Sequence, residues 1–292
     1  MKKILITGAG SYIGTSFARY MARWPESYQV DTLDMLDVGW RNTSFAGYDA
    51  VYHVAGIAHS DSGPISPEKA KLYYRVNTDL TVETARKAKD DGVKQFIFMS
   101  SAIVYGESAP IGQEKVITAE TEPSPANAYG DSKLQAERGI LPLQDSTFKV
   151  VILRPPMVYG RGSKGNYPVL AKLARKLPVF PDVTNCRSMI YIENLLEFVR
   201  LMVENEEQGI FWPQNEAYSN TAQLAKSIAA AHGKKLLLVP GLTWGLKLAS
   251  HMTGLVNKAF GSLCYDQALS RYSQPYCVKT LKESIEETEG IA

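Results

Sequence analysis

The stretch Ile6–Gly14, "ITGAGSYIG", follows a short apolar run and opens a helical pattern. Gly8 and Gly10 let the backbone turn tightly and approach a ligand, and Gly14 lets the helix pack close to the strand. The helix N-terminus then points free N–H groups at an anion, for which a pyrophosphate is well suited. Ser11 stands where glycine is usual, so its side chain must point away from the phosphates or bond to them. On its own the stretch indicates either a dinucleotide-binding turn or a plain strand-to-helix connection.

An acidic residue about 20 positions further on would hold the adenosine ribose of a dinucleotide. Asp34 in "VDTLDM" lies at that distance, at the end of a strand-like run. Asp31 is a weaker candidate because the alternation of "VDTL" places it in mid-strand. An acid here favours NAD over NADP, since it would repel a 2′-phosphate, although NADP stays open.

Composition excludes several classes of function. The 292 residues are 45% hydrophobic with a net charge of +2, and no basic run indicates nucleic-acid binding. We find neither a signal peptide nor an apolar stretch of about 18 residues, so we expect a cytoplasmic protein with no integral membrane segment. The apolar segment 242–260 indicates either a buried helix pair or contact with a membrane surface. The histidines and the three cysteines lack metal-ligand spacing, so we expect free thiols and no metal.

Short β-rich runs alternate with helical patterns, which predicts a parallel sheet wrapped by helices. Strands are expected at residues 3–7, 29–33, 49–55, 95–100, 149–153 and 236–239, and helices at 12–24, 67–91, 128–140 and 221–232. Glycine and proline become frequent after residue 160. We therefore place a nucleotide-binding domain at 1–160 and a smaller lobe at 161–292, of which some segments return to the sheet.

Tyr129 and Lys133 in "AYGDSK" lie four residues apart, hence on one face of a helix. A cationic lysine near a phenol should lower the pKa of the phenol from about 10 towards neutrality. Such a tyrosine can exchange a proton with an alcohol or sugar hydroxyl while a nicotinamide exchanges a hydride. A serine at the strand end "MSS" could hold the same oxygen.

Seven segments, in this order, resemble the extended short-chain dehydrogenase/reductase family, in its NAD-dependent epimerase/dehydratase branch. They are "ITGAGSYIG", "YDAVYHVAG", "YRVNTDLTVETARKA", "FIFMSSAIVYG", "YGDSK", "ILRPPMVYG" and "RSMIYIENL". The resemblance implies a Rossmann-type, doubly wound α/β fold that holds NAD(P), with a C-terminal lobe for a UDP-sugar. It also implies a homodimer built on the helices around 72–88 and 129–140.

The resemblance assigns roles residue by residue. It implies the catalytic set Ser101, Tyr129 and Lys133, with Ser101 rather than Ser100 as the family serine. The implied cofactor residues are Gly8, Gly10, Ser11, Tyr12, Ile13, Gly14, Asp34, Val54, Ala55, Gly56, Asn77, Tyr129, Lys133 and Pro155. The implied substrate residues are Ser101, Asn166 and Arg187, the arginine against the diphosphate.

Three departures from the family pattern bear on function. Ser11 replaces the middle glycine of the turn. The stretch 28–49 is short, as if one strand–helix step were trimmed, so Asp34 could bind adenine rather than ribose. Ser188 replaces a usual aspartate, which leaves the sugar preference open.

Three functions compete on this sequence. They are a UDP-hexose 4-epimerase that keeps its NAD, an NAD(P)H-dependent reductase of a 4-keto-6-deoxy UDP-sugar in polysaccharide synthesis, and a non-catalytic NAD(P)-sensing regulator. The intact Ser101, Tyr129 and Lys133 weigh against the regulator.

Overall fold

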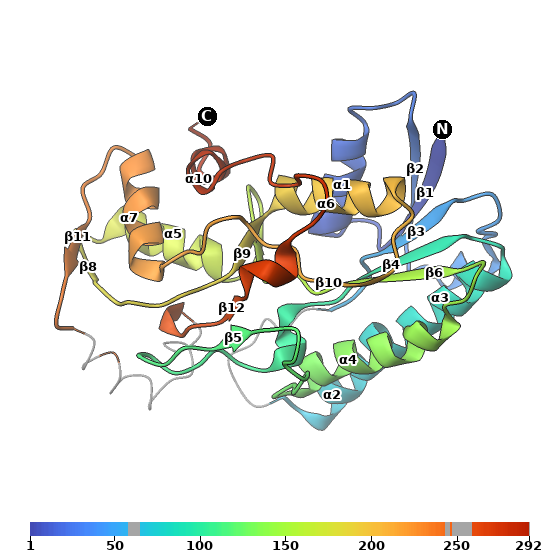
Figure 1. Cartoon of the computed structure of the whole chain (residues 1–292), viewed down its shortest axis with the longest axis horizontal. Coiled ribbons are helices and arrows are strands. Elements are labelled where there is room, and N and C mark those ends of the chain that lie inside the picture. The colour runs from blue at the N-terminus through green and yellow to red at the C-terminus, as the bar shows by residue number, and fades with distance from the viewer. Residues whose placement is uncertain (58–64, 243–245, 247–258, 292) are drawn as a thin grey trace.

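A parallel sheet of six strands forms the centre of the computed structural model, which describes residues 1–57, 65–242, 246 and 259–291 (Figure 1). Its strands are β1 (Lys2–Thr7), β2 (Tyr28–Leu33), β3 (Ala50–His53), β4 (Gln95–Met99), β6 (Lys149–Leu153) and β10 (Gly209–Phe211), in the order β10-β6-β4-β3-β1-β2. Parallel strands are covered on both faces and therefore read as apolar runs, and all five residues of β4 are buried.

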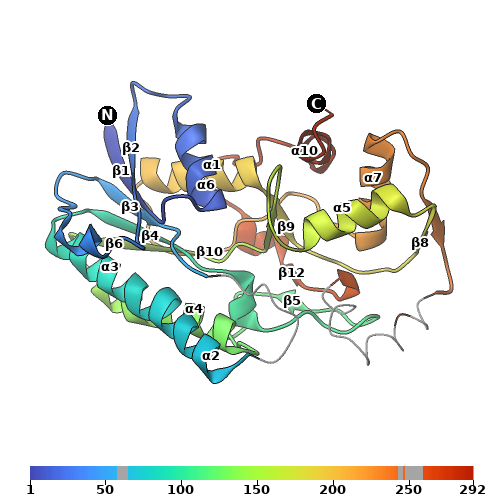
Figure 2. The same ribbon diagram turned by 180° about the vertical axis from the view of Figure 1, so that it is seen from behind.

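Helices cover both faces of this sheet (Figures 1 and 2). One layer contains α1 (Tyr12–Met21) and α6 (Ile192–Glu204); the other contains α2 (Pro67–Tyr73), the π-helix η2 (Tyr74–Asp79), α3 (Leu80–Asp90) and α4 (Ala128–Ile140). Each helix layer packs against one face of the sheet and buries an apolar core there. The predicted Rossmann-type, doubly wound α/β fold is confirmed. The single helix predicted over 67–91 is instead three consecutive helical segments.

The connection between β2 and β3 is short. A Rossmann sheet ordinarily has a further strand outside its second strand, whereas here β2 is the edge. Only the 3-10 helix η1 (Val38–Asn42) lies between β2 and β3. Its Trp40 and the following Phe45 are buried in the core beneath the sheet. There they occupy the space that the missing strand–helix unit would fill.

The second half of the chain builds a separate end of the molecule and also returns to the sheet (Figure 1). That end contains α5 (Asn166–Lys176), α7 (Thr221–Ala231) and the parallel pair β8 (Val179–Pro181) and β11 (Leu237–Val239). Strand β10 pairs with β6, and α6 packs on α1. The remaining elements are the 3-10 helices η3 (Ala102–Tyr105), η4 (Leu141–Leu143) and η5 (Gln267–Ser270), the strand pairs β5 (Val116–Ile117) with β12 (Cys264–Tyr265) and β7 (Met157–Tyr159) with β9 (Met189–Tyr191), and α10 (Leu281–Thr288). Most of the apolar segment 242–260 lies outside the described residues.

Candidate active site

The turn after β1 has the geometry of a phosphate cradle. Gly8 has φ +117°, and a Cβ added to it would lie 2.7 Å from the backbone nitrogen of Ala55, so only glycine fits between β1 and β3. Gly10 has φ +78° and faces open space. The Ser11 hydroxyl caps α1 by accepting from the Gly14 N–H at 3.1 Å, which explains how serine replaces glycine here.

This cradle fits a dinucleotide pyrophosphate. Tyr12 and Ile13 begin α1, whose first N–H groups have no acceptor within the helix, and its first turn carries no acid. The N–H groups of Gly8 and Ala9 donate to the Leu33 carbonyl at 3.0 and 3.1 Å. That contact places the turn beside Asp34, which is exposed just beyond β2. By contrast, Asp31 accepts the Tyr48 hydroxyl at 3.0 Å.

A second cluster of predicted residues gathers at the end of β3. Asn77 accepts the Ile57 N–H at 2.9 Å and donates to the Ile57 carbonyl and to the Ser132 hydroxyl, both at 3.1 Å. A Cβ added to Gly56 would meet Asn77 Oδ1 at 3.0 Å and Lys133 Nζ at 3.2 Å. The π-helix thus places Asn77 where it fixes the chain after Val54 and Ala55 against α4, and π segments often occur at functional sites.

Tyr129 and Ser101 meet at the C-terminal end of β4. The Ser101 side chain is close enough to the Tyr129 phenol to lower its pKa, and the Tyr129 ring lies 5.6 Å from that of Tyr73. Close by, Lys133 Nζ donates to the Met99 carbonyl at 2.9 Å, and the Pro155 carbonyl accepts the Ala102 N–H at 2.9 Å. The structure therefore brings the predicted catalytic residues to one edge of the sheet.

The expected lowering of the Tyr129 pKa is wrong for this structure. Burial of the phenol raises its pKa to about 12, and the neighbouring Ser101 side chain acts in the opposite direction. Burial also lowers the pKa of Lys133 to about 8, against the opposing influence of Glu137. The lysine ammonium is directed at the Met99 carbonyl, so desolvation rather than lysine charge dominates at the phenol.

Sequence reasoning missed a buried polar group beneath this site. Glu137 accepts a very short hydrogen bond from the Ser100 hydroxyl and forms a buried ion pair with Arg154, whose Nη2 lies 2.6 Å from Glu137 Oε2. Ser100 is therefore turned into the protein, which leaves Ser101 to face Tyr129. The signal was available, because Tyr129, Lys133 and Glu137 recur every four residues on α4.

The predicted substrate residues other than Ser101 lie in other elements. Asn166 is exposed at the start of α5, while its neighbour Tyr167 is buried and stacks on Tyr159 at 5.2 Å. Arg187 Nη1 donates to the Ala259 carbonyl at 3.1 Å, and burial lowers the arginine pKa. Ser188 donates to Gln214 Oε1 at 2.5 Å and accepts the Tyr265 N–H at 2.8 Å, so its hydroxyl joins β9 to β12.

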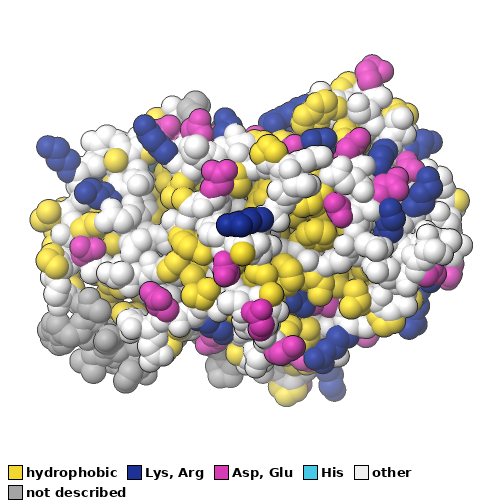
Figure 3. All heavy atoms as spheres, viewed as in Figure 1, with side chains coloured by type: hydrophobic (Ala, Val, Ile, Leu, Met, Phe, Trp, Pro, Cys, Tyr) yellow, Lys and Arg dark blue, Asp and Glu magenta, His cyan; other side chains and the backbone are white. Residues whose placement is uncertain are grey.

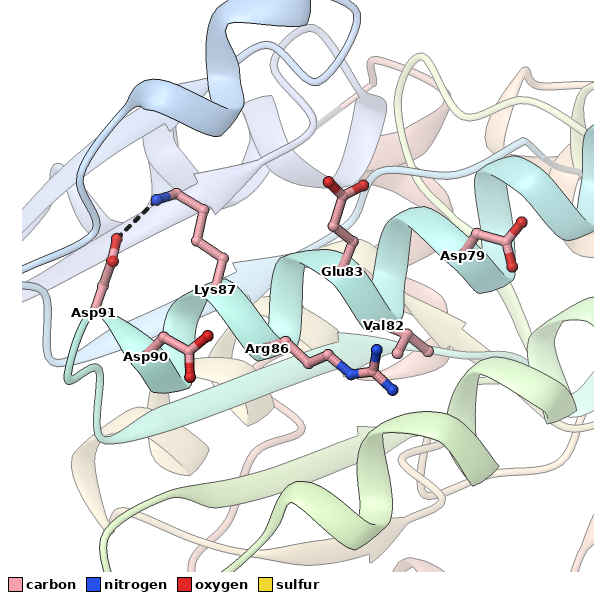
Figure 4. Close-up of a pocket in the computed structure, with 7 residues that line it drawn as sticks. All are labelled: Asp79, Val82, Glu83, Arg86, Lys87, Asp90 and Asp91. Carbon is pink, nitrogen blue, oxygen red and sulfur yellow. Dashed lines mark hydrogen bonds and ion pairs between the residues drawn. The ribbon is translucent and has the colours of Figure 1, made fainter.

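The outer face of α3 carries an open hollow of about 620 Å³ (Figure 4). Its lining is mostly charged and includes the ion pair of Lys87 with Asp91 at 3.0 Å. None of its lining residues belongs to the candidate site. Over the described ranges, no cluster of three or more His, Cys, Asp or Glu side chains could hold a metal ion. Nor does any helix in the described part of the chain have the length and apolarity to cross a bilayer.

Comparison with known proteins agrees with this geometry. The family model described as "NAD dependent epimerase/dehydratase family" matches residues 4–212. A UDP-glucose 4-epimerase of Vibrio cholerae is 31% identical over 91% of this chain and 87% of its own length. A UDP-glucuronic acid 4-epimerase of Bacillus cereus, solved with NAD, superposes with a TM-score of 0.75 at 19% identity, over 99% of this chain and 96% of the other. A dTDP-4-dehydrorhamnose reductase of Clostridium acetobutylicum gives a TM-score of 0.72 at 19% identity, over 98% of both chains.

The chain belongs to the NAD-dependent epimerase/dehydratase family, as the sequence resemblance predicted. Membership identifies an enzyme of the epimerase or oxidoreductase kind with a nicotinamide dinucleotide as cofactor, which the cradle of Gly8, Gly10 and Ser11 fits. Both epimerases and reductases share the fold, so the fold alone does not separate these two activities.

Proposed function

We propose that the protein is a UDP-hexose 4-epimerase that keeps NAD bound through the catalytic cycle. The observation that carries the proposal is the placement of Ser101, Tyr129 and Lys133 at one edge of the sheet, where Lys133 Nζ donates to the Met99 carbonyl at 2.9 Å. Similarity to the Vibrio cholerae UDP-glucose 4-epimerase over most of both chains supports the sugar class.

In this proposal Tyr129 takes the proton of the sugar C4 hydroxyl and later returns it. Ser101 holds the same oxygen and keeps the phenol directed at it. The bound NAD would supply hydride transfer at C4. Deprotonation of Tyr129 requires its pKa of about 12 to fall, and the Lys133 ammonium is the charged group on the same helix face that can favour the phenolate.

We assign the cofactor to the cradle of Gly8, Gly10, Ser11, Tyr12, Ile13 and Gly14, and to Asp34, Val54, Ala55, Gly56, Asn77 and Pro155. The exposed carboxylate of Asp34 favours NAD over NADP because it would repel a 2′-phosphate. We assign the nucleotide sugar mainly to residues 161–292, with Asn166 and Arg187 as its ligands. We also place the enzyme in the cytoplasm.

Reduction of a 4-keto-6-deoxy UDP-sugar is the second candidate, since a solved 4-dehydrorhamnose reductase shares the fold over almost the whole chain. The same tyrosine and serine would serve, but NAD(P)H would be consumed in each turnover. A regulator that only senses NAD(P) would have no need to keep Ser101, Tyr129 and Lys133 together.

The decisive assay incubates UDP-glucose with the purified protein and follows UDP-galactose together with NADH absorbance. We expect interconversion without net NADH change. Tyr129→Phe should keep nucleotide binding and lose about 10²- to 10⁴-fold in turnover, because only the hydroxyl is removed. Tyr74→Phe is the matched control, since its hydroxyl bonds Asp131 at 2.7 Å on the same helical layer; it should turn over normally.

Stoichiometric oxidation of NADPH by a 4-keto-6-deoxy UDP-sugar, with no epimerisation, would replace the epimerase by the reductase. Turnover of Tyr129→Phe within a few-fold of wild type would remove this phenol from the mechanism.

We propose a homodimer as the working form, built on α3 and α4. Its interface would include charged residues, because the outer face of α3 carries Glu83 and Arg86, and Asp79 directly precedes this helix (Figure 4). Sedimentation of the purified chain at several concentrations measures this mass directly.

A further inference from the structure

Exposed apolar side chains gather at the end of the molecule formed by α5, β8 and β11. They include Val169 and Leu173, four residues apart on α5, and Leu177 at its C-cap. Val179 on β8 and Leu237 on β11 are 45% and 64% exposed, and they are direct partners in the strand register. We call these five residues the α5–β8 patch. Clusters of exposed apolar side chains are typical of interaction sites.

The surroundings of the patch are basic. Residues 161–182 contain five Lys or Arg and one acid, the exposed Asp182, and Arg175 pairs with Glu289 at 3.3 Å; residues 232–242 contain two Lys and no acid. Lys172, Lys176 and Lys235 are exposed. Lys172 and Lys176 each directly precede a leucine of the patch, so on the helix they lie beside it. Figure 3 shows the face of the molecule seen in Figure 1, on which basic and acidic side chains are both scattered among hydrophobic ones.

The base under the patch is rigid. The opposite face of α5 buries Tyr167, Ala171 and Ala174 in the main core. The β11 end is fastened to α5 because Lys234 Nζ donates to the Arg175 carbonyl at 2.7 Å. The patch is therefore presented in one orientation, which lowers the entropic cost of docking.

Charge decides between the surfaces that could cover this patch. Cores of protein interfaces are depleted of lysine, whereas helices that lie in a membrane interface combine leucine with lysine. Lysine stems can run along apolar surface while the ammonium reaches lipid phosphates. We propose that the α5–β8 patch docks on an anionic membrane surface, with the leucines at the headgroup–acyl boundary and the lysines on the phosphates.

The test is sedimentation of the full chain with vesicles of phosphatidylcholine alone or mixed with phosphatidylglycerol. Wild type should pellet with the mixed vesicles, less so as salt is raised. Leu173→Ser/Leu237→Ser should lower the binding constant by about tenfold or more, because less apolar area is buried. Lys172→Gln/Lys176→Gln should lower it by about fivefold per residue. Leu36→Ser/Val278→Ser, which changes side chains 90% and 45% exposed outside the patch, should bind as wild type.

Absence of binding to the mixed vesicles would overturn the proposal, as would equal binding by the Leu173→Ser/Leu237→Ser variant. A dimer of wild type that this variant loses, without lipid binding, would make the patch an interface between two copies instead. The variants change exposed positions, so their melting temperatures should match wild type; if this pair melts lower, Val169→Ser replaces it. The outcome does not depend on the proposed activity, because no substrate or cofactor enters the assay.

Discussion

His53 shows how far one buried residue can depart from its ordinary chemistry. Its ring bonds the Thr7 hydroxyl at 2.7 Å and the Thr81 hydroxyl at 3.1 Å, tying β1 and β3 to α3. Burial, with a smaller contribution from the charge of Lys133, lowers the pKa of His53 to about 3. The ring therefore stays neutral and acts as a structural link rather than a proton carrier.

This lowered pKa predicts a specific acid sensitivity. The unfolded chain binds a proton at His53 below about pH 6.5, whereas the folded protein does so only below about pH 3. The free energy of unfolding should therefore fall as pH drops through this window, by about 1.4 kcal/mol per pH unit from this residue. His53→Gln should lack that slope in urea titrations at several pH values. Parallel pH curves for wild type and variant would contradict the lowered pKa.

At the scale of elements, helix packing depends on one glycine. A Cβ added to Gly139 on α4 would lie 2.5 Å from Val82 Cγ2 on α3. Alanine ordinarily favours a helix over glycine by about 1 kcal/mol, but overpacking costs about 1–3 kcal/mol, and the β-branched valine cannot turn aside easily. Gly139→Ala should thus lower the free energy of unfolding by about 1 kcal/mol. Gly139→Ala/Val82→Ala should recover this loss relative to Val82→Ala alone, and additive losses would show that the two helices are not in contact here.

The sequence predicted the elements best where the signal was local. The helix at 128–140 and the strand at 149–153 agree with α4 and β6 to the residue. It gave no signal for β5 and β12, because these two-residue strands pair across more than 140 positions. The candidate site shows the same contrast between local sequence signals and long-range packing. Ser101, Tyr129 and Lys133 lie at one edge of the sheet, but the sequence did not predict the burial that raises the pKa of Tyr129.

At the scale of the whole molecule, Arg154 joins segments that lie far apart in the chain. Besides Glu137 on α4, its guanidinium bonds the Tyr105 hydroxyl at 2.6 Å, and that hydroxyl also accepts from the Trp212 ring nitrogen at 2.7 Å. The Arg154 carbonyl accepts the Tyr265 hydroxyl at 2.7 Å. Both halves of the chain therefore meet at one buried cation.

Removal of this cation should be costly for the whole fold. Arg154→Met leaves the Glu137 carboxylate buried without its partner, so we expect a loss of about 3–5 kcal/mol in the free energy of unfolding. Arg154→Met/Glu137→Gln removes both charges and should recover a large part of that loss. Denaturant titrations of the three proteins measure the difference, and an equal loss in the single and double variants would show that the unpaired charge is not the cause.

The π-helix at Tyr74–Asp79 determines which residues of the helical stretch 67–90 face the core. Tyr73, Asn77, Thr81 and Ala85 are all buried, at intervals of four residues. On an uninterrupted α-helix, twelve residues would turn Ala85 about 120° away from Tyr73, out of the core. The π-helix has more residues per turn and offsets this rotation, so all four side chains stay on one buried face. An uninterrupted α-helix along the same path would need one residue fewer. In this chain the extra residue is accommodated within a helical turn and not in a loop.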